Sequence, residues 1–301
     1  MSRRYAILDV FTDRPLAGNP LAVVLDAEGL DAVRMQAIAA EFNLSETVFV
    51  LPPERPVHSA SLRIFTPAQE LPFAGHPTVG TAVLLGLERA AATGNGNDEM
   101  VLVLEEQVGP VRCGVSLHGA GAGHAIFDLP RLPEAGEPPP GAEAIAAALT
   151  LVPGEIGFEN HRPTVYDAGL AYTLVPVRDL AAIAKAKVNP AAWQAGFGSR
   201  SAYLYCRETI ESGHGFHARM FGPAFGITED PATGSAAAAL AGAIARFDQP
   251  PGGSHHYVIE QGFEMGRPSL IGLEIDMDGG AVVEGRLGGD AVVVARGTLE
   301  A

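Results

Sequence analysis

Glu46 and two glycine-led turns are the parts of this sequence whose residue types could do chemistry. Glu46 stands in the segment NLSET (43–47), directly ahead of the apolar run 48–51. A carboxyl group in an apolar cleft has a raised pKa and can both take and return a proton. A glutamate at the edge of a strand would only face solvent, and surface glutamates are the more common kind. The residues alone leave both interpretations of Glu46 open.

The two turns lie in similar segments of the chain. Residues 63–82 read RIFTPAQELPFAGHPTVGTA, and residues 219–238 read RMFGPAFGITEDPATGSAAA. Each begins Arg-x-Phe-x-Pro-Ala and passes through a glycine, Gly75 or Gly234, into small and apolar residues typical of a helix. Although Gly and Pro turns are common enough to match by chance, the shared order predicts an internal duplication with two similar lobes.

The start of each helix offers backbone N–H groups that the helix itself does not use, so two such starts could bind a carboxylate. The alternatives are that Gly75 and Gly234 only permit tight turns, and that Asp230 or Ser235 caps the second helix. The duplication favours the binding site over a pair of unrelated turns. The polar residues around the two turns are His76, Thr78, Glu229, Asp230, Thr233 and Ser235.

The elements that would position these residues mix helices and strands. Apolar runs bounded by Gly and Pro predict many short strands, which include 47–51 and, near the end of the chain, 281–287 and 291–299. Helical patterns span 30–42, 78–89, 142–149, 180–186 and 234–246. The Pro-rich passage 130–140 is the best linker candidate, and the order of elements restarts after it. We expect an N-terminal lobe of 1–117, completed by a strand at about 288–301, and a C-terminal lobe of 118–287.

Composition excludes several classes of protein. With 20 basic and 35 acidic residues the net charge is -15, so a nucleic-acid partner is not expected. Cys113 and Cys206 are the only cysteines and form no CxxC pair, so neither a disulfide framework nor a thiolate zinc site is expected. No secretory leader or membrane-length apolar run is evident, which predicts a cytoplasmic protein without a membrane partner.

Cofactor motifs are also missing. The segment GHPTVG (75–80) has the glycines of a phosphate loop without its Lys-Ser/Thr, and no GxSxG elbow occurs. Lys185 and Lys187 are the only lysines, so a pyridoxal phosphate Schiff base has few candidates. The pairs His214/His217 and His255/His256 lack a HExxH context and are taken as surface or strand histidines. We expect no cofactor and no metal.

The sequence resembles the PhzF family of phenazine-biosynthesis-like isomerases over essentially its whole length. The resemblance implies an α+β fold of the diaminopimelate-epimerase type, with two similar lobes, a β-barrel-like sheet around a central helix in each, and the active site between them. It also implies a cofactor-free isomerase, usually a homodimer, whose best-known member acts on a dihydro-hydroxyanthranilate. The segments that carry it are DVFTDRPLAGNPLAVV (9–24), FNLSETVFV (42–50), 63–82, EDPATGSAAAALAG (229–242) and QGFEMGRPS (261–269).

Site roles follow from the resemblance residue by residue. Glu46 of the SET motif is similar to the catalytic general acid/base. His76 and Asp230 are similar to residues that bind substrate and handle protons, and Gly75, Gly234 and Ser235 to residues that contact the carboxylate or ring. In related epimerases and racemases a cysteine sits at each helix start, whereas this chain has Ala74 and Thr233 there. Racemisation by two thiols is therefore not expected.

The expected activity is isomerisation of a small carboxylic acid, in which Glu46 removes a C–H proton and returns it elsewhere on the same face. Helix starts and Ser235 would hold the carboxylate and stabilise developing charge. An epimerase or dehydratase acting on an amino or hydroxy acid is the enzymatic alternative. A non-catalytic ligand-binding protein of the same fold is the alternative of another class.

Overall fold

The computed structural model describes residues 2–93, 99–119 and 121–301. They fall into two compact units, Met1–Pro130 together with Leu287–Ala301 (unit 1), and Arg131–Arg286 (unit 2). The break between Pro130 and Arg131 comes later in the chain than the 117/118 boundary expected from the sequence, because residues 122–128 pair with unit 1. None of the described helices is long and apolar enough to span a membrane.

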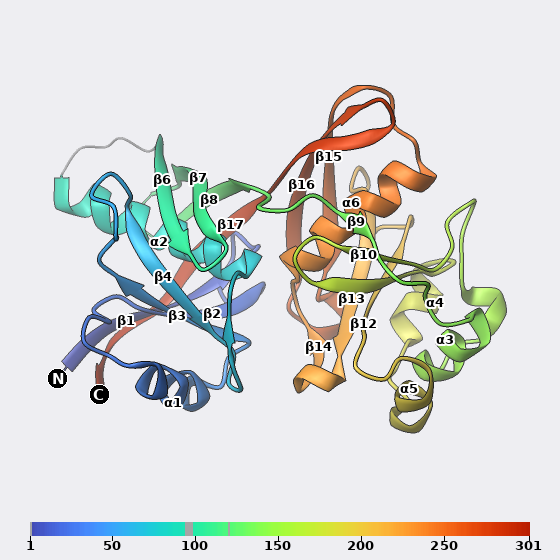
Figure 1. Ribbon diagram of the computed structural model, residues 1–301, viewed down its shortest axis with the longest axis horizontal. Coiled ribbons are helices and arrows are strands. Elements are labelled where there is room, and N and C mark those ends of the chain that lie inside the picture. Colours follow the sequence, from blue (N-terminus) through green and yellow to red (C-terminus); the bar gives the residue numbers. More distant parts are fainter. Residues whose placement is uncertain (1, 94–98, 120) are drawn as a thin grey trace. The chain divides into compact units, whose positions relative to one another are not determined.

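The strands of unit 1 pair edge to edge until the ring closes (Figure 1). The pairings run β1–β2–β3–β4–β6–β7–β8, and β17 pairs with both β8 and β1. A closed ring leaves no sheet edge exposed among these strands. The strands are β1 (Ser2–Val10), β2 (Asn19–Val24), β3 (Glu46–Leu51), β4 (Ala60–Phe65), β5 (Glu70–Leu71), β6 (Glu99–Glu106), β7 (Gly109–Leu117), β8 (Ala122–Asp128) and β17 (Ala281–Glu300).

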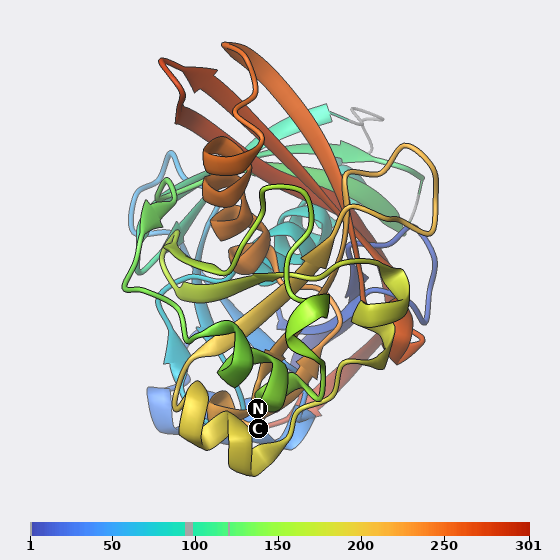
Figure 2. The ribbon, with the colours of Figure 1, turned by 90° about the vertical axis from the view of Figure 1, so that its right-hand side faces the viewer.

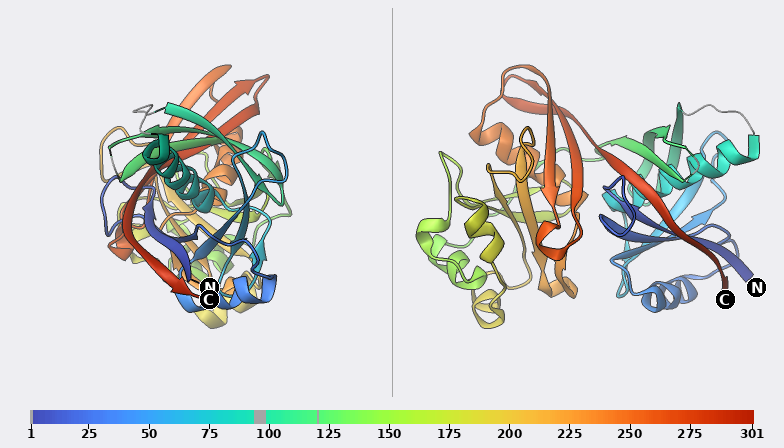
Figure 3. Two further views of the ribbon diagram at one scale, coloured as in Figure 1. Left: turned by 90° about the vertical axis from the view of Figure 1, so that its left-hand side faces the viewer. Right: turned by 180° about the vertical axis from the view of Figure 1, so that it is seen from behind.

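Helix α2 (Gly75–Thr93) runs through the middle of this barrel, as the left view of Figure 3 shows. It contacts β1, β2, β3, β6, β7 and β8, and every residue from Gly75 to Leu84 is buried. Helix α1 (Ala32–Phe42) packs outside, where Met35, Ile38 and Ala39 meet Phe49 and Phe65. The sequence predicted that α2 starts at Thr78. It starts at Gly75, because a proline is well tolerated within the first helical turn, where its missing N–H is not needed.

Unit 2 wraps its strands around a second buried helix, α6 (Gly234–Phe247), which contacts β9, β10, β11 and β16 (Figure 2). Three shorter helices cover its other core, which is built around Leu149, Val175, Trp193 and Leu204. The remaining α-helices and strands of unit 2 are β9 (Glu134–Ala135), α3 (Ala142–Leu149), β10 (Thr164–Asp167), β11 (Ala171–Pro176), α4 (Leu180–Lys185), α5 (Pro190–Gly196), β12 (Ser201–Cys206), β13 (Phe216–Gly222), β14 (Ile227–Asp230), β15 (Gly253–Gln261) and β16 (Ser269–Asp278).

The internal duplication is confirmed by the order of strand pairings. In unit 1 the steps β1–β2, β2–β3, β3–β4, β4–β6 and β6–β7 alternate antiparallel and parallel. In unit 2 the steps β10–β11, β11–β12, β12–β13, β13–β15 and β15–β16 alternate in the same way. A short strand, β5 or β14, pairs with the fourth strand of each series and leads into the buried helix. The predicted α+β fold of two similar lobes is therefore confirmed.

The same side-chain contact occurs at the matching place in each unit. Arg63 on β4 makes two parallel hydrogen bonds to Glu70, each 2.7 Å, and Arg219 on β13 makes two to Glu229, of 2.8 and 2.9 Å. Each guanidinium also lies over the ring of the phenylalanine two residues on, at 5.2 Å for Phe65 and 4.9 Å for Phe221. These bidentate pairs fix the hairpin that carries the chain to the start of α2 or α6.

Candidate active site

Glu46 is the first residue of β3 and faces the first turn of α2. Its Oε2 atom lies 3.2 Å from Nδ1 of His76, and only 14% of the Glu46 side chain and 4% of the His76 side chain are exposed. Parallel pairing of β2 with β3 places Glu46 opposite Leu21, one residue from Pro20. The interpretation of Glu46 as a surface residue at a strand edge is wrong, because the barrel wall and α2 enclose it.

The imidazole of His76 is neutral at neutral pH. Burial lowers its pKa to about 3, although a hydrogen bond to the backbone of Pro20 opposes that shift. A neutral ring donates one hydrogen and accepts at its other nitrogen. His76 therefore lies beside Glu46 as a neutral group and not as the positive partner of an ion pair.

The start of α2 brings backbone donors to the same place. The N–H of Thr78 bonds to the carbonyl of Ala74 at 3.2 Å, which is the first bond of the helical pattern. The N–H groups of Gly75 and His76 come before it and have no acceptor within the helix. Unit 1 thus joins a carboxyl group, a neutral imidazole and two backbone donors around one helical turn.

In unit 2, Asp230 ends β14 and lies just ahead of α6. It is 6% exposed, and its Oδ2 atom accepts a 2.6 Å hydrogen bond from the hydroxyl of Thr233. Thr233 is the residue before the first turn of α6, and its side chain makes no capping hydrogen bond. The alternative in which Asp230 or Ser235 caps α6 is wrong, since Asp230 binds the Thr233 side chain and Ser235 lies within the helix.

The amide of Gln261 fixes this turn from the end of β15. Its Nε2 atom donates to the Asp230 carbonyl at 2.8 Å and to the Thr233 hydroxyl at 3.0 Å. Its Oε1 atom accepts from the Thr233 N–H and from the Tyr203 hydroxyl, both at 3.2 Å. Because one buried amide binds the turn through both of its polar atoms, the backbone between Asp230 and Thr233 has little freedom.

Ser235, the second residue of α6, pairs with Tyr172 on β11. The two hydroxyl oxygens are 2.8 Å apart, and either can donate. Gly234 precedes Ser235 as the first residue of α6, so the helix start again presents backbone N–H groups beside a hydroxyl. If Tyr172 donates, the hydrogen of the Ser235 hydroxyl is available for an anionic ligand.

Of the six residues that the sequence singled out, Glu46, Gly75 and His76 come together in unit 1, and Asp230, Gly234 and Ser235 come together in unit 2. Sequence reasoning missed Tyr172 and the carboxyl group of Glu106, which contacts Thr78. It also gave no role to Gln261, although this residue opens the QGFEMGRPS segment. Their positions depend on strand pairing between distant parts of the chain, which no local motif reveals.

Neither cysteine is placed for catalysis. Cys113 on β7 and Cys206 on β12 are buried, and burial raises the pKa of both thiols, to about 12 for Cys206. The two helix starts carry Ala74 and Thr233 instead. A reaction between two thiolates therefore has no basis in this chain.

One group of potential metal ligands occurs among the described residues, and it has a cation of its own. Glu159, His161 and Asp248 in unit 2 lie close enough to share an ion. The guanidinium of Arg207 binds Asp248 at 2.6 Å and lies 3.4 Å from Glu159. Because Arg207 already balances these carboxylates, we assign the group to ion pairing.

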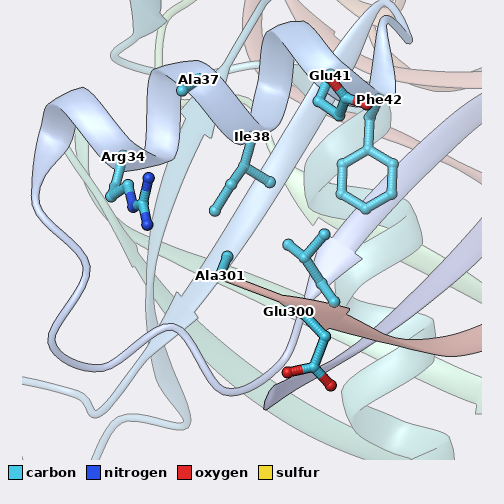
Figure 4. A pocket seen from close by; sticks show the side chains of 8 residues that line it. Arg34, Ala37, Ile38, Glu41, Phe42, Glu300 and Ala301 are labelled. Atoms are coloured by element: carbon cyan, nitrogen blue, oxygen red, sulfur yellow. The ribbon is translucent and has the colours of Figure 1, made fainter. Parts of the chain in front are cut away.

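A shallow groove separates α1 from the end of β17 (Figure 4). Ile38, Phe42 and Leu299 supply its apolar wall, and Arg34 and Glu41 lie at its side. It contains none of the six predicted site residues, so it is not the candidate active site.

Comparison with known proteins gives consistent matches over the whole chain. The PhzC-PhzF family, described as phenazine biosynthesis-like protein, matches residues 8–297. An uncharacterized isomerase of Mesorhizobium japonicum is 53% identical, with 99% of each chain covered. Trans-2,3-dihydro-3-hydroxyanthranilate isomerase of Pseudomonas chlororaphis is 35% identical, with 98% of each covered. The solved structure of a predicted epimerase from Pseudomonas aeruginosa has a TM-score of 0.80 and 33% identity, with 99% of each chain covered.

Proposed function

Because this chain belongs to the PhzC-PhzF family of phenazine biosynthesis-like proteins, we propose that it isomerises a small carboxylic acid by proton transfer through Glu46, without a cofactor. It is an isomerase, as its named relatives are. The observation that carries the proposed mechanism is the contact between Glu46 Oε2 and His76 Nδ1, 3.2 Å apart at the start of α2.

Glu46 acts first as a base and then as an acid. Its carboxylate removes a proton from one carbon of the substrate, and the electron pair left behind moves along the conjugated system. The protonated Glu46 then delivers that proton to another carbon on the same face, which restores the carboxylate and completes the isomerisation. His76 is neutral and buried, so it packs against the carboxyl group at 3.2 Å without fixing it in an ion pair.

The helix starts bind the substrate's negative charge. The start of α2 presents backbone N–H groups at Gly75, and the start of α6 presents those of Gly234 and Ser235 together with the Ser235 hydroxyl. Each of these two groups of donors suits a carboxylate oxygen or charge that develops during proton transfer. Asp230, held by Thr233, would bind a positively charged or hydrogen-bonding group such as an amine.

The substrate class follows from these donors and from the relatives. The Pseudomonas chlororaphis enzyme is named for trans-2,3-dihydro-3-hydroxyanthranilate, a cyclic acid with amino and hydroxyl substituents. We propose a substrate of that class for this chain, and a cytoplasmic homodimer as its working form. Light scattering on the purified protein tests the dimer.

The decisive experiment compares wild type with Glu46→Gln in deuterated water, using trans-2,3-dihydro-3-hydroxyanthranilate and a panel of amino and hydroxy acids. We expect rearranged product from wild type and from the control Glu41→Gln, whose side chain is exposed on α1. The new C–H position should carry deuterium in those turnovers in which the Glu46 acid exchanges with solvent before it returns the proton. Glu46→Gln should lose at least about 10²-fold in kcat, because a positioned acid/base supplies that much. A Glu46→Gln protein with full activity would refute the mechanism.

The same assay decides between the alternatives. Epimerisation, suggested by the Pseudomonas aeruginosa structure described as a predicted epimerase, would invert one centre without moving a double bond. Dehydration would release water. A binding protein would gain thermal stability from a panel member and exchange no deuterium into it.

A further inference from the structure

A second carboxyl group lies at the first turn of α2, on a different side of the helix from Glu46. Glu106 ends β6, is 7% exposed, and approaches Thr78 with its Oε1 atom 2.8 Å from the threonine hydroxyl. Glu46 approaches His76 from β3. The turn that presents the Gly75 and His76 N–H groups is thus held by one glutamate from each of two strands.

The hydrogen count at Thr78 determines the protonation state of Glu106. The Thr78 hydroxyl oxygen lies 2.8 Å from the Ala74 carbonyl oxygen and 2.8 Å from Glu106 Oε1. A hydroxyl has one hydrogen, and a threonine within a helix commonly donates it to the carbonyl four residues back. The second contact then needs a hydrogen from Glu106, which only the neutral acid has.

The other oxygen of Glu106 supports the same assignment. Its Oε2 atom is buried, and no hydrogen-bond partner for it occurs among the protein atoms that the structure describes. An unpartnered oxygen of a neutral acid costs far less free energy than an unpartnered oxygen of a buried carboxylate. Burial accordingly raises the pKa of Glu106 to about 8.

Among the residues that the structure describes, no neighbouring charge stabilises an ionised Glu106. On α2, His76 is neutral, and on β7, Cys113 is a buried thiol whose pKa Glu106 raises further. The charged groups of the adjoining strands have other partners. Arg63 of β4 pairs with Glu70, and Arg112 of β7 pairs with Asp128. Glu105 of β6 binds His58 and the N–H groups of Glu54 and Arg55.

We propose that Glu106 is kept as a neutral carboxylic acid beside the start of α2, and that its ionisation weakens the binding of an anionic substrate there. A negative charge at a helix N-terminus competes with an anionic ligand for the positive end of the helix dipole. The neutral acid leaves that end free. Glu106 is a positioning residue that acts through Thr78 and the helix start. This inference rests on the proposed carboxylate substrate, whereas the neutrality of Glu106 can be tested without it.

The first test is the affinity of the folded protein for 3-hydroxyanthranilate, an aromatic carboxylate, measured by calorimetry from pH 6.5 to 9.5. We expect Kd of wild type to rise roughly tenfold across pH 8, the scale expected for one nearby charge. Glu106→Gln, which is neutral at every pH, should keep the low Kd throughout. Glu99→Gln, an exposed glutamate on the same strand, should behave as wild type. An equal rise in Glu106→Gln and wild type would overturn the role of Glu106.

Turnover gives a second readout that a purely structural role would not move. If trans-2,3-dihydro-3-hydroxyanthranilate is converted, KM of wild type should rise above pH 8 with kcat nearly constant, and Glu106→Gln should remove the rise in KM. A change in kcat alone would contradict the inference.

The third test needs no ligand. Infrared difference spectra of wild type minus Glu106→Gln should contain the carbonyl band of a protonated acid at pH 6.5, and the band should vanish above pH 8. The thermal stability of Glu106→Gln should exceed that of wild type by an amount that grows from about pH 4.5 to 8, because in this range Glu106 ionises only in the unfolded wild type. Above pH 8 the difference should stay constant. Absence of the band refutes a neutral Glu106. If the band is present and wild type binds no carboxylate at any pH, the proposed function and the binding role both fail.

Discussion

His76 and His217 show how the surroundings of a histidine decide its charge. His76 lies in the first turn of α2, close to Pro20 of β2, and burial lowers its pKa so far that it is neutral. His217 on β13 is fully buried as well, yet its two ring nitrogens lie 2.8 Å from Glu260 and 3.0 Å from Glu264. Burial opposes the charge on His217, but the two glutamates outweigh it and raise the pKa.

The stability contributed by His217 should therefore depend on pH. A histidine whose folded-state pKa is above the unfolded value stabilises the fold fully below about 6.5 and loses that effect as pH rises through the folded-state pKa. We expect His217→Gln to lower the free energy of unfolding by about 3 kcal/mol at pH 6, as removal of one partner from a buried ion pair does, and by much less at pH 10. Urea unfolding at both values checks this. An equal loss at the two pH values would mean that His217 is neutral in the fold.

At the residue scale, the sequence allows a site residue to be named only where that residue stands in a recognisable segment. Glu46, His76 and Asp230 could be named because motifs surround them, and the structure places each beside a helix start. Glu106 could not, because an acidic residue at the end of an alternating strand is indistinguishable from a solvated one until the barrel closes over it. His217 was correctly taken as a strand residue, whereas His214 lies in the loop before β13 with only 15% of its side chain exposed. Their shared partner Glu260 lies more than forty positions away.

At the scale of elements, the paired Arg–Glu contacts of the two units differ in burial. Arg219 is 7% exposed and also donates to the carbonyls of Ile183, Ala184 and Ala186 at the end of α4. Arg63 is 28% exposed, and its guanidinium has no such carbonyl partners in the part of unit 1 that the structure describes. In unit 1 the Arg–Glu pair therefore stabilises only a hairpin. In unit 2 the matching arginine stabilises a hairpin and also the end of α4.

Replacing each arginine by alanine should show how much each contributes to the free energy of unfolding. We expect Arg219→Ala to cost about 3–5 kcal/mol, because it strands the Glu229 carboxylate and three carbonyl groups. Arg63→Ala should cost about 1 kcal/mol, as for a partly exposed pair. Chemical denaturation followed by circular dichroism measures both. Equal losses would show that the extra bonds of Arg219 contribute nothing to stability.

Most elements follow from local patterns, and the exceptions have physical reasons. Helix α5 was missed because its seven residues are too few for a helical period, although Asn189 caps it and Trp193 stacks on Phe197 inside. Two strands were predicted over 281–299, where β17 is continuous. Gly288 lies between the two predicted strands, where a glycine is typical of a break. In the structure a Cβ at this position would lie 2.6 Å from the Ala125 carbonyl oxygen, so only glycine fits there. The glycine lets β17 approach β8 and so marks close pairing and not a break.

At the scale of the whole molecule, unit 1 is built from two separated parts of the chain. Residues 287–301 supply the strand that pairs with β1 and β8, and Leu299 and Ala301 pack against the core around Phe49. Unit 2 is a single stretch, and its core combines residues 145–221, the helix α6 and buried residues of β15 and β16 such as Ile259 and Leu273. The two units therefore depend differently on the end of β17.

Removing residues 287–301 should expose this difference. In the shortened chain β1 and β8 become open edges, so we expect the amide hydrogens of residues 2–128 to exchange rapidly. Those of residues 142–278 should stay protected. Hydrogen exchange read by mass spectrometry, with the full chain as control, makes the comparison. A protected unit 1 in the shortened chain would mean that the ring is stable without its closing strand.

The place of β17 also sets an order for synthesis on the ribosome. Residues 2–128 emerge first, but the strand that closes their barrel is translated only after all of unit 2. Nascent chains usually complete their domains from the N-terminus onward. Here residues 2–128 remain an open sheet around α2 until β17 has been translated. Unit 2 is translated later than these residues but can complete its fold before them.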